Sequence, residues 1–265
     1  MHQENSTIRF NNQVGNGYYK IGITCGPEYS AAVPGQFVTL KIAGRMDPLL
    51  RRPFSIHRLV KRGEQVDGLE ILYRVVGGFT GQLSEMRENE PLDLLGPLGH
   101  GFSVSNTVKN PLFVAGGIGV APIVFLAETL QDRGADLSGA FVFMGGKTAS
   151  DILCEGDFAR LGMGAAITTE DGSKGEKGLV TTLLDAYLET QKPDVIYACG
   201  PHGMLHAVAD MAAARQIRCE VSIETVMACG LGVCMGCATK TKDFPGGYRH
   251  ICKHGPVFDA SVVVF

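Results

Sequence analysis

Residues 111–134 read PLFVAGGIGVAPIVFLAETLQDRG: an uncharged apolar run, a glycine-rich turn, and a stretch with helical periodicity. The uncharged part falls just short of a membrane-spanning length and is interrupted by Gly116, Gly117, Gly119 and Pro122, so we interpret it as a buried strand, a turn and a helix. A strand that leads through glycines into a helix is where the phosphates of a dinucleotide bind in α/β domains. The segment lacks the complete G-x-G-x-x-G pattern, and a tight turn that needs small residues is the alternative.

The same alternation continues to residue 224. Further apolar runs, AFVFMGG, AAITTE, DVIYACG and RCEVSIE, are separated by segments of helical period, DILCEGDFARLG, LVTTLLDAYLETQ and HGMLHAVADMAAARQ. Together they predict five strands of a parallel sheet with right-handed crossovers. Cys199, Gly200 and Pro201 end one of these strands before a helix that starts near His202, which marks a second open edge for a nucleotide. Cys199 is compatible both with a buried thiol and with a residue that packs under a nicotinamide.

Residues 7 to about 100 follow a different pattern. Apolar and polar residues alternate with period two, and turn residues break the runs TIRFNNQV, GYYKIGITC, GQFVTLKIA, SIHRLVKRG, LEILYRVVGG and PLDLLGPLG. This pattern is typical of an antiparallel sheet or small barrel. The fold class is therefore α+β multidomain, with an N-terminal antiparallel β-barrel, a central five-stranded parallel α/β nucleotide-binding domain and a loop-rich C-terminal tail.

Composition limits the function classes. The chain has 265 residues, 45% hydrophobic and 19% charged, with a net charge of −3, which excludes a disordered chain. A sequence pI near 6.2 argues against a broad basic surface for nucleic acid. The start, MHQENSTIRF, has neither a basic nor an apolar signal region, so we expect a cytoplasmic protein without a membrane span.

The eight cysteines fall into two groups. Cys25, Cys154, Cys199 and Cys219 are scattered among apolar neighbours and are expected to be core thiols. The other four, Cys229, Cys234, Cys237 and Cys252, follow the order C-x4-C-x2-C…C of plant-type [2Fe-2S] ferredoxins, with interleaved glycines that let the backbone turn its N–H groups toward the sulfurs. A tetrahedral zinc site and four structural thiols are the alternatives.

A flavin site is predicted on the barrel. Arg52, Pro53, Phe54 and Ser55 open a strand and combine a cation for a pyrophosphate, a flat apolar ring and a small hydroxyl. Leu72, Tyr73 and Arg74 add a second aromatic and cation, and Gly77-Gly78-Phe79-Thr80-Gly81 leads into a short helix with Thr80 as its expected N-cap. The alternative for Arg52 alone is a surface arginine before a buried strand.

Other polar residues carry weaker predictions. His57, His100, His202, His206, His250 and His254 show no metal-ligand spacing, so we place His202 and His206 on a helix surface. Thr169, Glu170 and Asp171 offer acids more suited to a ribose hydroxyl than to an added phosphate and so favour NAD over NADP, although Lys147 weakens that inference.

Together these motifs resemble the ferredoxin-reductase superfamily and, more narrowly, the electron-transfer subunits of the class B dihydroorotate dehydrogenases. The resemblance covers nearly the whole chain, in the order LLRRPFSI, ILYRV, DLLGPLGHGF, AGGIGVAP, EDGSKGEKGLVT, ACGPHGML, CGLGVCMGCATKT and ICKHGPVF. It implies that residues 52–55, 72–74 and 79–80 bind FAD and that the four clustered cysteines bind the metals. Phe79 stands where the family commonly has glycine.

The resemblance also implies a function. Electrons would pass from dihydroorotate, through a flavin-bearing catalytic subunit, the [2Fe-2S] cluster and FAD, to NAD+, in pyrimidine biosynthesis and in a heterotetramer with two copies of each subunit. Expected domains are 1–102 for FAD, 103–223 for NAD and 224–265 for the cluster. A reductase subunit that serves a hydrogenase, a sulfide-oxidising enzyme or ferredoxin would share every motif, and a zinc-stapled binding module is the non-enzymatic alternative.

Apolar residues accompany the clustered cysteines. Met227, Leu231, Val233 and Met235 lie beside the predicted ligands. The sequence allows two interpretations with nearly equal weight: an exposed contact surface for a partner subunit, or side chains that pack inward on their own domain.

Overall fold

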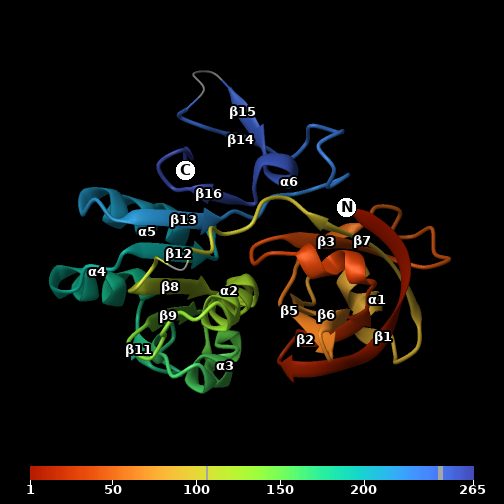
Figure 1. The fold of residues 1–265 in the computed structure, drawn as a ribbon, viewed down its shortest axis with the longest axis horizontal. Helices are drawn as coiled ribbons and strands as arrows, with labels where there is room; N and C mark the ends of the chain where they lie inside the picture. The colour runs from red at the N-terminus through yellow and green to blue at the C-terminus, as the bar shows by residue number, and fades with distance from the viewer. Residues whose placement is uncertain (106, 244–246) are drawn as a thin grey trace.

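The computed structural model describes residues 1–105, 107–243 and 247–265. Figure 1 shows the N-terminal sheet, in red and orange, beside the α/β domain, and the last forty or so residues, in blue, above both. Within the described residues, no helix has the length and apolar character needed to cross a membrane.

The N-terminal domain is a curved antiparallel sheet of seven strands in the order β4-β3-β7-β1-β2-β6-β5. The strands are β1 (His2–Gly15), β2 (Tyr18–Thr24), β3 (Phe37–Ile42), β4 (Arg52–Ser55), β5 (Arg58–Arg62), β6 (Gln65–Arg74) and β7 (Pro91–Leu98). Alternate residues such as Val38 and Leu40 fill the core of this sheet. β1 begins earlier than the alternation predicts, because the polar run at residues 2–6 pairs with β7.

The second sheet contains the five predicted parallel strands and two short strands that the pattern did not reveal. Its order is β11-β10-β9-β8-β12-β13-β16. The predicted strands are β8 (Pro111–Gly116), β9 (Phe141–Gly146), β10 (Gly164–Thr169), β12 (Val195–Cys199) and β13 (Arg218–Ser222). The added edge strands are β11 (Glu176–Lys177) and β16 (Val257–Asp259), of which β16 runs antiparallel to β13.

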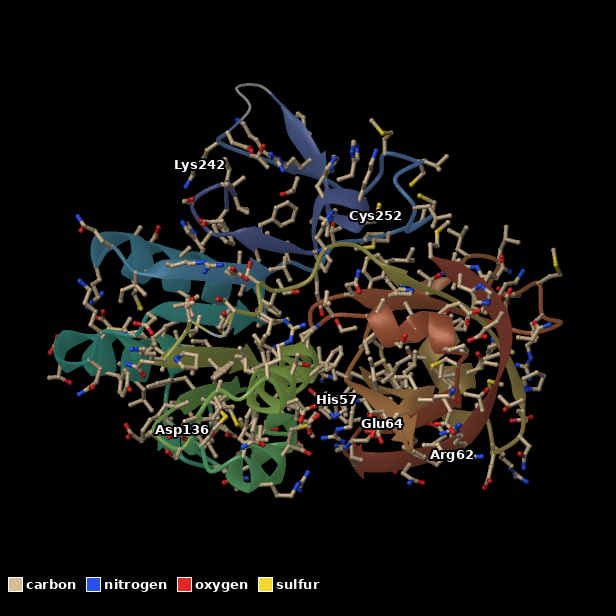
Figure 2. All side chains as sticks on the ribbon, viewed as in Figure 1. His57, Arg62, Glu64, Asp136, Lys242 and Cys252 are labelled. Carbon is tan, nitrogen blue, oxygen red and sulfur yellow. The ribbon has the colours of Figure 1, made fainter. Side chains whose placement is uncertain are left out.

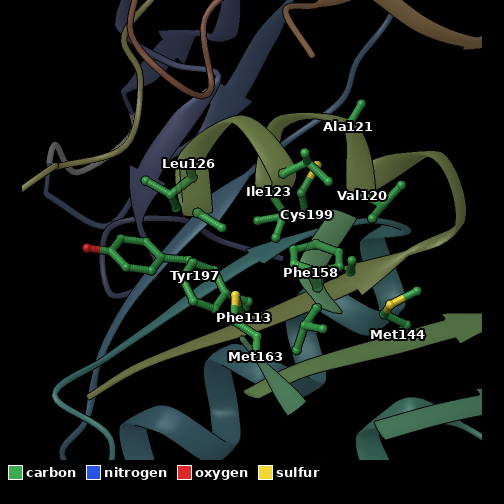
Figure 3. Close-up of a cluster of buried hydrophobic side chains, with 14 of the residues drawn as sticks. Phe113, Val120, Ala121, Ile123, Leu126, Met144, Phe158, Met163, Tyr197 and Cys199 are labelled. Atoms are coloured by element: carbon green, nitrogen blue, oxygen red, sulfur yellow. The ribbon is translucent and has the colours of Figure 1, made fainter. Parts of the chain in front are cut away.

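Helices cover both faces of this sheet. The helical segments of the chain are α1 (Gly78–Glu85), α2 (Val120–Asp132), α3 (Glu155–Arg160), α4 (Val180–Thr190), α5 (His202–Ala214), α6 (Ile251–His254) and the short η1 (Pro27–Ala31), η2 (Gly117–Gly119) and η3 (Ala149–Asp151). Figure 3 shows Ile123 and Leu126 of α2 above Phe113 and Tyr197 of the sheet. α4 and α5 bury residues such as Leu184 and Val208 in a second cluster of buried apolar side chains.

The C-terminal tail is more ordered than a loop. β14 (Ala238–Lys240) and β15 (Tyr248–His250) form a hairpin, and α6 follows directly. β16 then pairs with β13 through Glu220↔Asp259, Val221↔Phe258 and Ser222↔Val257. The last part of the expected cluster domain is therefore a strand of the α/β sheet, because Val257 and Phe258 supply the apolar pair that this sheet edge buries.

A polar junction joins the N-terminal sheet to the α/β domain. Arg58 of β5 donates to Glu128 of α2 at 2.9 Å and to Asp157 of α3 at 3.1 Å, and it also pairs with Glu70 at 3.1 Å. His57, labelled between the two domains in Figure 2, is fully buried, with Nδ1 3.1 Å from the carbonyl oxygen of Ala121. These contacts are directional, so they fix the orientation of one domain against the other.

Candidate functional site

A cavity of about 530 Å³ lies against β4 and β6. Every residue predicted for FAD lines it: Arg52, Pro53, Phe54, Ser55, Leu72, Tyr73, Arg74, Phe79 and Thr80. β4 and β6 thus bring two guanidinium groups and two aromatic rings to one hollow, and Phe37 of β3 and Phe79 of α1 add two more rings. The set suits a ligand with a flat ring system and phosphates.

We call this hollow the flavin cavity, after the ligand that the sequence predicts for it, and aromatic contacts shape its floor. The ring of Phe54 packs edge-on against Tyr73, with centroids 6.1 Å apart, and lies 6.0 Å from the ring of Phe79. Phe79 is almost fully buried, so the phenylalanine that stands in place of the family's glycine packs on Phe54 and into the core of the N-terminal sheet.

The helix beside the cavity starts earlier than predicted. Gly77 is the N-cap of α1, and Thr80 lies in its first turn. The Thr80 hydroxyl accepts hydrogen bonds from the backbone N–H groups of Val76 and Gly77, at 2.9 and 3.1 Å. The prediction of Thr80 as N-cap was wrong, because the two glycines let the chain turn into the helix three residues sooner.

A second cavity, of about 590 Å³, lies at the carboxyl ends of the parallel strands. Gly116, Gly117, Gly119, Gly200 and Pro201, all predicted for the nucleotide, line it. A methyl group on Gly119 would lie 2.3 Å from the carbonyl oxygen of Cys199, so only glycine allows the turn before α2 to approach β12 this closely.

We call this second hollow the dinucleotide cavity, after the ligand predicted for it. Cys199 lies under it and does not line it. The side chain is fully buried beneath the glycine turn, and burial raises the pKa of its thiol well above the ordinary value. Figure 3 shows it among the apolar side chains under α2. The position is that of a core thiol at the base of the cavity.

The two cavities share a wall. Arg74, Ile118 and Glu224 line both of them. Glu224 follows the buried strand β13; the residue stays partly exposed at the cavity, but the protein packed around its carboxyl group removes water from it and raises its pKa. Sequence reasoning missed Glu224 and Ile118 as site residues; an acid directly after a buried strand at the carboxyl edge was the available indication of Glu224.

Of the predicted ribose-binding residues Thr169, Glu170 and Asp171, only Glu170 lines the dinucleotide cavity. Glu170 and Lys147 line the cavity. Thr169 is buried and exchanges hydrogen bonds with the backbone of Lys174, and Asp171 accepts bonds from Ser173. Thr169 and Asp171 therefore shape the turn, and Glu170 is the acid available to a ribose.

The clustered cysteines form one loop region next to the N-terminal sheet. The backbone N–H groups of Leu231 and Cys234 donate to the sulfur of Cys229 at 3.3 and 3.4 Å, and that of Gly232 donates to Cys252 at 3.0 Å. The sulfurs of Cys237 and Cys252 are 3.2 Å apart. Gly232 has φ +76°, a left-handed conformation that glycine adopts without strain.

The electrostatics of this loop favour a thiolate at Cys229, whereas burial and the neighbouring Cys237 raise the pKa of the Cys252 thiol to about 12. Burial opposes ionisation of Cys229, but the N–H groups of Cys234 and Leu231 outweigh it and lower the pKa of the thiol to about 6. Hydrogen bonds from backbone N–H groups to sulfur are the outer contacts that iron–sulfur sites use. Among the described residues, no group of three or more His, Cys, Asp or Glu side chains is already arranged to hold a metal ion. The donor set fits an iron–sulfur cluster.

The apolar residues beside the cysteines divide into two kinds. Leu231, Val233 and Met235 are 40%, 77% and 59% exposed. Met227 is half-buried, packs on the α/β core and lines the flavin cavity. The partner-surface interpretation therefore fits three of the four residues, and Met227 packs inward.

The four scattered cysteines, and His202 and His206, lie where the sequence predicted, with one difference. Cys25, Cys199 and Cys219 are buried, whereas Cys154 is half-buried. His202 and His206 lie on the exposed face of α5, where the ring of His206 stacks on Phe265.

Comparison with known proteins relates the whole chain to one group. Residues 224–264 match the model of the iron-sulfur cluster binding domain of dihydroorotate dehydrogenase B, and residues 113–210 match the oxidoreductase NAD-binding domain. Two relatives are named dihydroorotate dehydrogenase B (NAD(+)), electron transfer subunit. The protein from Geobacillus sp. (strain WCH70) is 35% identical over 100% of this chain and 99% of its own, and that from Desulforamulus reducens is 38% identical over 88% and 87%.

The fold is also found in solved structures. A chain of the NADH-dependent reduced ferredoxin–NADP oxidoreductase superposes with a TM-score of 0.83 at 26% identity, covering 98% of this chain and 89% of that one. A ferredoxin NADP+ reductase from Neisseria gonorrhoeae superposes with a TM-score of 0.69 at 16% identity, over 83% of this chain and 99% of the other.

Proposed function

Because the chain belongs to the family of electron-transfer subunits of dihydroorotate dehydrogenase B, we propose that its two cavities and its cysteine loop hold FAD, NAD and a [2Fe-2S] cluster in adjoining sites. Arg52 and Arg74 would pair with the FAD pyrophosphate, Phe54 and Tyr73 would contact its rings, and Ser55 would face the reactive edge. Bound FAD converts between the two-electron chemistry of NAD and the one-electron chemistry of iron and sulfur.

The observation that carries this proposal is the shared wall. Arg74, Ile118 and Glu224 line both cavities, so a ring in the flavin cavity and a ring at the inner end of the dinucleotide cavity meet there. Gly116, Gly117 and Gly119 would receive the dinucleotide phosphates at the start of α2, and Cys199, Gly200 and Pro201 would close the base of that site. Glu170 would accept from the ribose hydroxyls.

The four cysteines Cys229, Cys234, Cys237 and Cys252 would ligate the cluster. Their C-x4-C-x2-C…C order and their backbone hydrogen bonds support two irons and four thiolates over a single zinc ion. We assign residues 1–102 to FAD, 103–223 to NAD and 224–265 to the cluster, with β16 returning to the NAD-domain sheet.

The partner belongs to the same proposal. A flavin-bearing catalytic subunit would oxidise dihydroorotate and dock on the exposed side of the cysteine loop, as a cytoplasmic heterotetramer with two copies of each chain. Leu231, Val233 and Met235 are exposed beside the ligands, where a closed structural site needs no apolar surface.

The test compares the chain alone with the chain plus a catalytic subunit. We expect the isolated chain to contain flavin and iron, to reduce artificial dyes with NADH and to leave dihydroorotate unoxidised. Leu231→Asp and Met235→Asp should abolish dihydroorotate–NAD+ coupling and retain dye reduction. A colourless protein with stoichiometric zinc, oxidation of dihydroorotate by the chain alone, or full coupling in both variants would contradict the respective part of the proposal.

A further inference from the structure

The cysteine loop touches the N-terminal sheet on the outer face of β3. A methyl group placed on Gly230, the residue after Cys229, would lie 3.1 Å from Cγ2 of Thr39 and 3.7 Å from Cε2 of Phe37. A third neighbour, Cδ1 of Leu98 on β7, would lie at 3.8 Å. The backbone of the loop therefore passes directly over the side chains of Phe37 and Thr39.

Phe37 also borders the flavin cavity. It lines the same hollow as Arg52 and Ser55, and in the sheet it stands directly opposite Ser55 of β4. Only 3% of the residue is exposed. On its other side it belongs to the cluster of buried side chains that includes Cys237 and Cys252.

The strand pattern explains this double position. Val38 and Leu40 point into the core of the N-terminal sheet, so Phe37 and Thr39 point outward, toward the C-terminal region. The pairing of β3 with β7 shifts register between Phe37 and Thr39. A shift of this kind redirects a side chain at the edge of a site.

We infer that Phe37 is a positioning residue for electron transfer, which forms the dry wall between the flavin and the cluster. This inference rests on the proposed function, since it assumes that both sites are filled. The ring excludes water from the side of the cysteine loop that faces the flavin and holds Gly230 against β3. Electron transfer between two centres slows steeply with their separation, and the apolar shell of a cluster governs its solvent access and potential.

The experiment uses the full chain loaded with flavin and cluster, as wild type, Phe37→Leu, Phe37→Ala and the matched control Phe102→Leu. Phe102 is equally buried but lines neither cavity. A light flash with 5-deazariboflavin as one-electron donor starts electron exchange between flavin and cluster, followed in their separate absorption bands. We expect exchange to slow at least about tenfold in Phe37→Ala, less in Phe37→Leu, and not in Phe102→Leu.

Two further readouts do not depend on turnover. Water admitted by Phe37→Ala should stabilise the more negative reduced cluster, which raises its midpoint potential in a titration followed by electron paramagnetic resonance. Release of iron to a chelator should also be faster. If Phe37→Ala does not retain its cluster, Phe37→Leu alone decides the question by the same three measurements.

The outcomes separate the two proposals. The inference would be overturned if the Phe37 variants kept both cofactors and showed the same electron exchange, cluster potential and iron release as wild type. The proposed function would then stay intact. A wild-type chain that binds no flavin or no cluster would contradict the proposed function itself.

Discussion

The N-terminal sheet meets its two neighbours through junctions that differ in their polar content. Toward the α/β domain, apolar packing such as that of Phe125 of α2 in the N-terminal core is joined by polar contacts: Arg58 with Glu128 and Asp157, and Tyr18, whose hydroxyl donates to Asp151 at 2.6 Å. Toward the cysteine loop they are apolar, with Phe37 and Leu98 against Gly230. Hydride transfer requires the nicotinamide and flavin rings to keep one alignment, and directional polar contacts between the domains can fix it. Electron transfer between flavin and cluster requires instead a short distance between them and a path without water.

We expect the largest effect from substitutions in the cysteine loop, at the apolar junction. Serine at Cys229, Cys234, Cys237 or Cys252 should remove the visible cluster absorption, because each thiolate would hold an iron of the proposed cluster. Flavin should stay bound, since none of the four residues lines its cavity. Absorption spectra with iron and acid-labile sulfide analysis measure the effect, and Cys154→Ser, outside the loop, is the control. Full iron and sulfide in all four variants would refute the cluster assignment.

Next in size is loss of the ion pairs at the polar junction. Arg58→Ala leaves Glu128 and Glu70 without their cation and Asp157 with Arg160 alone, and should lower the free energy of unfolding by about 2–4 kcal/mol. Its side chain keeps 25% exposure, which places the effect below that of a fully buried pair. Urea unfolding followed by circular dichroism measures it. Arg62→Ala, an 84% exposed arginine paired with Asp67, is the control and should stay near wild type.

The same junction should be sensitive to acid. Burial lowers the pKa of His57 to about 4, with Lys20 and Arg58 acting in the same direction and Ala121 and Asp157 opposing them. The unfolded chain, with a histidine pKa near 6.5, binds this proton first, so the native state loses up to about 3 kcal/mol as pH falls from 6.5 to 4.

His57→Gln removes that titration. The difference in urea midpoint between wild type and His57→Gln, measured at pH 7.5 and at pH near 4.5, should shrink or reverse in acid. An equal difference at both pH values would show that protonation of His57 does not destabilise the junction in acid.

The smallest expected effect separates two arginines on the flavin side. Arg52→Ala and Arg74→Ala should each weaken FAD retention about tenfold or more, since a hydrogen bond to a charged group contributes about 1.5–3 kcal/mol. Only Arg74 also lines the dinucleotide cavity, so only Arg74→Ala should raise the KM for NADH. Flavin release on dilution and steady-state kinetics measure both effects, with the exposed Arg87→Ala as control. Unchanged flavin occupancy in both variants would count against the site.

The sequence predicted motifs made of neighbouring residues better than it predicted sites whose residues come together only in the fold. Spacing alone predicted the cysteine loop, because it depends on near neighbours. A strand start at Arg52 was also predicted, but the run that continues to residue 63 is divided into β4 and β5. Glu224, Ile118 and Phe37 escaped prediction, since their positions between sites arise only when β13, α2 and β3 come together. The polar start of β1 and the short β16 also carried too little periodicity to be recognised.

The pairing of β16 with β13 limits how this protein can be rearranged. A cut at residue 224 would seem to separate the cluster-binding part, yet it would remove Val257 and Phe258 from the α/β sheet and leave the edge of β13 unpaired. The cluster-binding part and the α/β domain are thus joined by β16, which belongs to the first in sequence and to the second in structure. Transplanting the cluster module to another reductase would require the recipient to offer a matching free sheet edge, so such exchange is expected to succeed only among chains that share this strand.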